Sequence, residues 1–83
     1  MISTNLMSTF YSLNNNIIKN LSTEVMEQYL NNFFEKNKIS IKQKSEIDIL
    51  KAISIDMSSQ IDNRFLNLAG QIELHLLKLN INP

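Results

Sequence analysis

His75 is the only imidazole in the chain, and no cysteine accompanies it. A histidine on a bundle helix can hold a metal when a glutamate precedes it by three residues, because both side chains then face the interior. Here Ile72 occupies that place, and Glu73 lies on another face of the same predicted helix. A structural zinc site would need more nitrogen or thiolate ligands than the chain provides. We therefore expect no metal and no cofactor, and we interpret His75 as a boundary or interface residue.

The remaining groups that could do chemistry are spread along the chain rather than paired. The acidic side chains of the C-terminal half are Glu46, Asp48, Asp56, Asp62 and Glu73. No serine stands in a Gly-x-Ser-x-Gly elbow, and the single glycine, Gly70, cannot build such a turn or a phosphate-binding loop. The sequence therefore predicts no catalytic residues, no small-molecule substrate and no enzyme.

One basic cluster stands out, formed by Lys36, Lys38, Lys42 and Lys44. It is a candidate contact for an anion or an acidic partner surface, or else a solvated turn whose charge complements the end of a helix. The eight basic and eight acidic side chains cancel, which disfavours a nucleic-acid binder. No aromatic residue interrupts the cluster to stack on bases. A small transcription-linked regulator, acting on DNA or on a DNA-bound protein, is the alternative function that these lysines leave open.

The elements that position these residues are predicted to be helices, because only Gly70 and Pro83 punctuate the chain. A first helix is expected over about residues 5–20, and a second over about 23–37, where Ser22 can cap the free amides of the first turn. Their apolar residues recur every three or four positions, as an amphipathic helix requires. These residues are Leu6, Phe10, Leu13 and Ile17, then Met26, Leu30 and Phe33.

The third predicted segment covers about residues 41–80 and carries the longest apolar pattern. Its apolar positions are Leu50, Ile53, Met57, Ile61, Phe65, Leu68, Ile72, Leu76 and Leu79. Their mean spacing is close to the 3.6-residue period of a straight helix. One long helix is favoured, and Ser40 or Ser45 could begin it. The alternative is a break at Ser58-Ser59 or at Ala69-Gly70, which would give a compact four-helix bundle.

The end of this segment is apolar on more than one face, which two short helices cannot cover. A chain of 83 residues without disulfides also has a thin core. We therefore predict a small all-α bundle in a single domain, residues 1–83, completed by dimerisation. Adjacent Phe33 and Phe34 cannot both face one core, so a phenylalanine of the second helix is included in the interface. The predicted interface residues are Phe34, Leu66, Leu74, Leu77 and Ile81.

These expectations favour a non-enzymatic interaction module that binds a partner protein or itself through an apolar helix face. A small adaptor, co-chaperone, inhibitor or assembly factor fits this description. A membrane-surface protein is a second alternative, disfavoured because such helices are usually rich in lysine and arginine. The absence of a long apolar run or a secretory signal pattern predicts a cytoplasmic location, in a host cell if a phage or pathogen encodes the chain.

Overall fold

The computed structural model describes residues 3–81, with side chains described as far as Leu79. Within that range the chain forms five helices and no strand, which confirms the all-α prediction. The helices are α1 (Thr4–Asn15), α2 (Thr23–Lys36), α3 (Lys38–Ile41), α4 (Glu46–Ser58) and α5 (Asn63–Ile81).

Serine side chains begin three of these helices. The hydroxyls of Ser3, Ser22 and Ser45 accept hydrogen bonds from backbone amides in the first turns of α1, α2 and α4, at 3.1–3.2 Å. Each bond satisfies a donor that has no partner inside the helix. The predicted cap at Ser22 is confirmed, whereas Ser40 begins no long helix. It lies inside the short α3, and its hydroxyl donates to the backbone oxygen of Asn37 at 3.1 Å.

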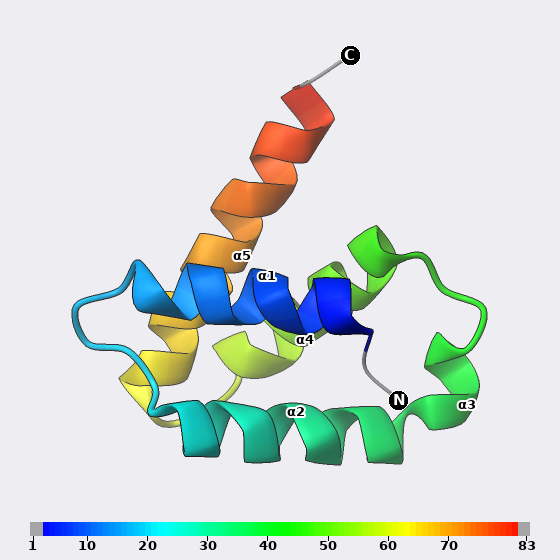
Figure 1. Cartoon of the computed structure of the whole chain (residues 1–83), viewed down its shortest axis with the longest axis horizontal. Coiled ribbons are helices and arrows are strands. Elements are labelled where there is room, and N and C mark those ends of the chain that lie inside the picture. The colour runs from blue at the N-terminus through cyan, green and yellow to red at the C-terminus, as the bar shows by residue number, and fades with distance from the viewer. Residues whose placement is uncertain (1–2, 82–83) are drawn as a thin grey trace.

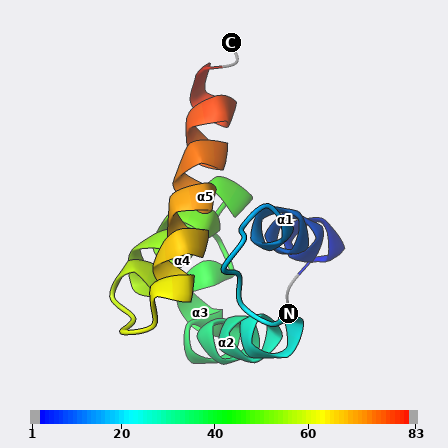
Figure 2. The same ribbon diagram turned by 90° about the vertical axis from the view of Figure 1, so that its left-hand side faces the viewer.

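The helices form two antiparallel pairs around one core (Figures 1 and 2). One pair is α1 and α2, which run in opposite directions one above the other, and the other pair is α4 and α5. The most deeply buried large side chains come from both pairs, and they are Phe10, Leu21, Met26, Leu30, Ile53, Met57, Leu68 and Ile72. The apolar stripes predicted for each half of the chain therefore meet in a shared core.

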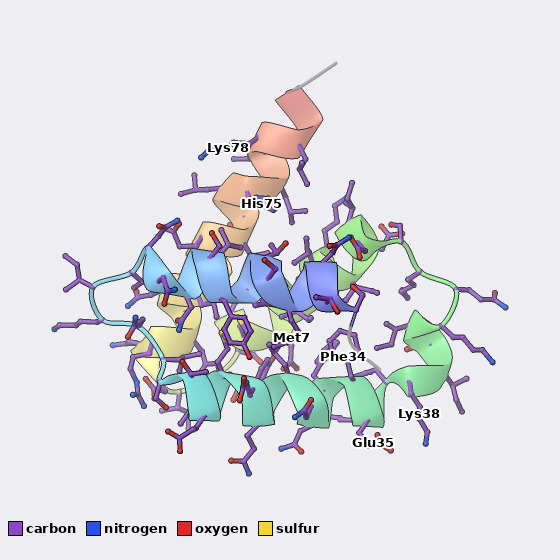
Figure 3. The ribbon with its side chains drawn as sticks, in the orientation of Figure 1. Met7, Phe34, Glu35, Lys38, His75 and Lys78 are labelled. Carbon is purple, nitrogen blue, oxygen red and sulfur yellow. The ribbon has the colours of Figure 1, made fainter. Side chains whose placement is uncertain are left out.

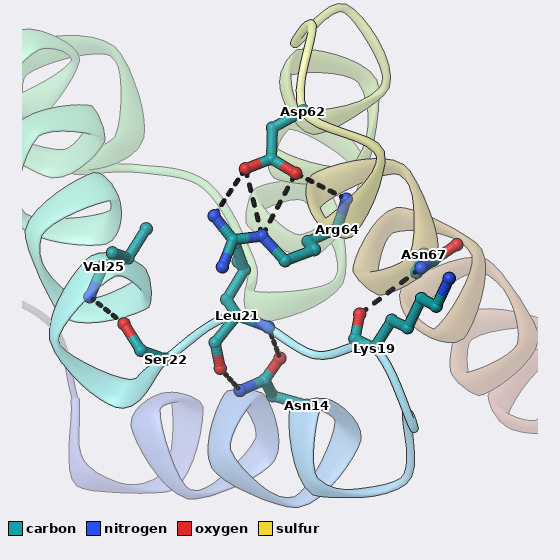
Figure 4. Close-up of polar contacts among 8 residues, drawn as sticks. All are labelled: Asn14, Lys19, Leu21, Ser22, Val25, Asp62, Arg64 and Asn67. Carbon is teal, nitrogen blue, oxygen red and sulfur yellow. Dashed lines mark hydrogen bonds and ion pairs between the residues drawn. The ribbon is translucent and has the colours of Figure 1, made fainter.

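The first helix ends five residues earlier than expected, because Asn14 bonds to the backbone beyond the helix. Its side-chain amide donates to the carbonyl oxygen of Leu21 at 2.8 Å, and its side-chain oxygen accepts from the amide of Leu21 at 3.1 Å (Figure 4). Asn14 is buried, so this pair of bonds satisfies two backbone groups that water does not reach. Local bonding by asparagine competes with helix continuation here.

The predicted continuous helix over residues 41–80 is wrong, because the chain turns between Ser58 and Asn63. The hydroxyls of Ser58 and Ser59 donate to the carbonyl oxygens of Ser54 and Asp56, at 2.8 and 2.7 Å. The turn folds α5 back onto α4, so the two halves of the long stripe bury each other. Ile61, which was expected in the core, lies in the turn and is fully exposed.

Gly70 does not interrupt α5, whose 19 residues make it the longest helix. At 1.5 Å per residue it extends about 28 Å. Its C-terminal half projects beyond the rest of the molecule in both ribbon views (Figures 1 and 2). This projecting half carries His75 and Lys78 (Figure 3).

Candidate interaction surfaces

The candidate chemical groups of the C-terminal half lie on α4, on α5 and in the turn between these helices. His75 is half-buried on α5, and Glu73 accepts a hydrogen bond from the Ser54 hydroxyl of α4 at 3.4 Å. No group of three or more histidine, cysteine, aspartate or glutamate side chains in the described range could hold a metal ion.

Two partly buried hydrogen bonds of tyrosine side chains hold helices to one another. The hydroxyl of Tyr29 on α2 donates to Asp56 on α4, and its ring lies 5.0 Å, centroid to centroid, from the ring of Phe65 on α5. Burial, together with the hydrogen bond and the negative charge of Asp56, raises the pKa of Tyr29 above its usual range. On α1, Tyr11 makes the corresponding bond to Glu27 of α2. These two tyrosines connect four helices, α1, α2, α4 and α5, around the core.

One surface feature extends along the solvent side of α5, and we call it the outer stripe: Leu66, Gly70, Leu74 and Leu77. Steps of four, four and three residues place these positions on one helix face. The opposite face carries Leu68, Ile72 and Leu76, all buried against the rest of the bundle. The helix is therefore apolar on two opposite sides, of which the fold uses one.

The three leucines of the outer stripe are each about half exposed, with exposed fractions of 51%, 53% and 54% for Leu66, Leu74 and Leu77. All three were predicted as interface residues, and the structure brings them together on one face. Ile81 was predicted with them, but its side chain lies outside the described residues. Exposed leucines in one continuous row are typical of a surface that a partner covers.

Gly70 lies in the middle of the outer stripe and has no function visible within the chain. A Cβ atom added at this position would meet nothing within 4 Å, and the residue does not need a positive backbone φ angle. Glycine inside a helix lowers stability by about 0.5–1 kcal/mol relative to alanine. The absence of a side chain does, however, let another backbone approach closely at this point.

The prediction of Phe34 as an exposed anchor is wrong for the single chain. Phe34 is 7% exposed and points from α2 towards the interior below α1 (Figure 3). Its neighbour Phe33 is half-buried, with its ring 5.9 Å from that of Phe34 in an edge-on arrangement. Phe34 belongs to the core and Phe33 packs against it, so both neighbouring rings contact the one core.

Three of the four clustered lysines line one pocket of about 740 Å³, which we call the lysine pocket. It is bounded by the start of α1, the end of α2, α3 and the start of α4. The residues that line it are Ser3, Leu6, Phe34, Lys38, Ile39, Ile41, Lys42, Lys44, Glu46 and Ile49. Lys36, the fourth lysine, is exposed at the end of α2 and does not line it.

Sequence reasoning identified the lysines of this pocket and missed its apolar floor. Leu6 and Ile49 are 43 positions apart in the chain, and no local spacing signals that they meet. Gly70 was considered only as a break point in a long helix. Its position four residues from both Leu66 and Leu74 was the available signal for a place in the outer stripe.

No protein-family model matches this chain, and it has no significant match among curated proteins or solved structures. No helix within residues 3–81 is long and apolar enough to cross a lipid bilayer.

Proposed function

We propose that the chain is a non-enzymatic interaction module that packs the outer stripe of α5 against a helix of another protein chain. The observation that carries the proposal is a row of half-exposed leucines around an exposed helical glycine. Packed helices lie about 8–10 Å apart, and small side chains at the crossing favour the shorter distances. Gly70 is then the crossing point, with Leu66 and Leu74 one turn away on either side.

The position of the stripe supports this function. The half of α5 that carries Leu74 and Leu77 projects beyond the bundle, so a partner can reach it without displacing another helix (Figures 1 and 2). The stripe itself contains no charged residue, and Glu73 and Lys78 are its charged neighbours. An apolar centre with a polar border is the usual arrangement of a protein interface. A partner protein and a second copy of this chain both fit this description, and an adaptor, co-chaperone, inhibitor or assembly factor would use such a surface.

The test compares Leu74→Glu with Ile55→Glu. Ile55 is the matched control, because it is also exposed but lies on α4 outside the stripe. Sedimentation velocity measures self-association, and a pull-down from nuclease-treated native cells measures retention of a partner. We expect Leu74→Glu to remove the self-association or the retained protein, and Ile55→Glu to preserve it. If neither variant alters assembly or partner retention, the proposed interface is wrong.

A further inference from the structure

We infer that the lysine pocket binds an amphipathic carboxylate, with its alkyl chain on the apolar floor and its head group at Lys42 and Lys44. This ligand class goes beyond the proposed function, because the pocket lies at the α3 end of the molecule and shares no residue with the outer stripe.

The floor of the pocket is suited to an alkyl chain. Leu6, Phe34, Ile41 and Ile49 come from four different helices, and each is buried in the core beneath the pocket. Ile39 also lines the pocket and is 87% exposed, so its side chain has almost no cover within the chain. Covering Ile39 with a hydrocarbon tail removes its apolar area from water, which is favourable in proportion to that area. The four floor residues are already buried and supply the surface on which the tail packs.

The charges of the pocket select an anion. Three lysines line it against one carboxylate, that of Glu46, so the lining carries a net charge of +2, or +1 when the ion pair of Lys38 with Glu35 is included. The Lys38 ammonium lies 3.3 Å from Glu35, and both side chains point to solvent, on the side of α2 that faces away from α1 (Figure 3). Lys42 and Lys44 form no ion pair with any residue in the described range. They are the cations left to meet a ligand.

Glu46 fixes the orientation of the ligand. Its Oε2 accepts a hydrogen bond from the Ser3 hydroxyl at 3.1 Å, which holds the carboxylate beside the start of α1. An anionic head group is repelled from that side and attracted to the turn that carries Lys42 and Lys44. The tail then lies across the floor, between Ile39 and Ile49.

The size of the pocket suits a compact ligand. Its volume of about 740 Å³ falls within the range of about 300–1,000 Å³ that is typical of small-molecule sites. The only aromatic ring in the lining is that of Phe34, which is buried, so no exposed ring is present to stack on a nucleic-acid base.

The test uses decanoate as the probe and amide chemical shifts of the full chain as the readout. We expect saturable shifts at Ile39, Ile41, Lys42 and Ile49, and much weaker binding of decyltrimethylammonium, which has the same chain length and the opposite charge. The double variant Lys42→Glu/Lys44→Glu should weaken decanoate binding by about tenfold or more, equivalent to about 1.4 kcal/mol. Lys36→Glu is the matched control, because it changes the same basic cluster outside the pocket and should leave the affinity unchanged.

A second variant tests the apolar floor without disturbing the core. Ile39→Ser removes an exposed side chain, so the fold should be retained while decanoate binding weakens.

Three results would overturn the inference. The first is equal affinity for decanoate and decyltrimethylammonium. The second is a loss of decanoate affinity in Lys36→Glu equal to the loss in Lys42→Glu/Lys44→Glu. The third is a set of chemical-shift changes confined to α5. Tighter binding in the pocket of a Glu/Leu-rich helical peptide would reassign it to a protein segment. Binding only to phosphatidylglycerol vesicles would reassign it to a membrane surface. Leu74→Glu should leave decanoate binding intact, so this inference and the proposed function can fail separately.

Discussion

The two apolar faces of α5 have similar composition and different roles. The inner face carries Leu68, Ile72 and Leu76, all buried, while the outer face carries the half-exposed leucines of the outer stripe. The inner face shares the core with α4 and α1, so it is explained by folding. The residues that the structure describes leave about half of each outer-face leucine exposed, and the middle position of this face is a glycine that lowers helix stability. This difference is the basis of our proposal that the outer face contacts another protein chain.

The largest expected effect follows from truncating the inner face. Ile72 is fully buried, so Ile72→Ala removes its apolar contacts and leaves a cavity in the core. Such substitutions lower the free energy of unfolding by about 2–5 kcal/mol. Urea denaturation followed by circular dichroism measures this loss. If Ile72→Ala lowers the free energy of unfolding by no more than the truncation of an exposed leucine does, the placement of α5 against the core is contradicted.

The corresponding change on the outer face should affect association and leave folding almost unchanged. In Leu74→Glu the new carboxylate remains in water in the free chain, so the unfolding free energy should change by no more than about 0.5 kcal/mol. In a complex it would be buried without a partner, which should weaken binding by about tenfold or more. Denaturation and binding measured on the same variant separate the two faces. A large loss of stability would show that the outer face belongs to the core.

Gly70→Ala sharpens the comparison, because its two effects should have opposite signs. The free chain should gain about 0.5–1 kcal/mol of stability, since alanine favours the helix and its Cβ meets no atom. Association should weaken, because the added methyl group separates the two helices at their crossing. Thermal melting and a binding titration report the two effects. Unchanged affinity would remove Gly70 from the interface.

The smallest effect at neutral pH is expected at Tyr29, whose hydroxyl connects α2 with Asp56 of α4. The pKa of Tyr29 is raised in the folded protein, so the native state keeps the phenol proton at pH values where the unfolded chain loses it. Its contribution to stability is therefore complete below the usual pKa of 10.0 and declines as the pH rises above it. Phenylalanine has no phenol proton to lose, so in Tyr29→Phe this part of the loss of stability at alkaline pH should disappear. Denaturation at several alkaline pH values checks it, and identical profiles for both proteins would contradict it.

Much of the fold could be predicted from residue spacing, because spacing determines which side chains share a helix face. Leu50, Ile53 and Met57 were expected in the core and are buried there, as are the inner-face residues of α5. Whether the helix continues through Ile61 could not be predicted, because a straight helix and a helical hairpin have the same apolar period. The outcome depends on the hydroxyl bonds of Ser58 and Ser59 and on how much of the stripe the rest of the chain covers.

The candidate surfaces were predictable to different degrees for the same reason. The outer stripe lies within one helix, so its leucines could be grouped from sequence alone. The lysine pocket combines residues from the start of α1, the end of α2, α3 and the start of α4, and only the tertiary fold brings Leu6 and Ile49 into one pocket with Lys42. Phe34 is a residue that local pattern assigned to the interface and that the tertiary fold buries.

The most direct test of the account is photo-cross-linking from α5 in native cells. A photoreactive amino acid at Leu77 on the outer stripe is compared with the same group at Ile55 on α4. We predict one discrete adduct from position 77 and none from position 55. An adduct of twice the 9.6 kDa chain mass identifies a second copy, and any other discrete mass identifies a partner protein. Equal adducts from both positions, or none from position 77, would contradict the assignment of the outer stripe as an interface.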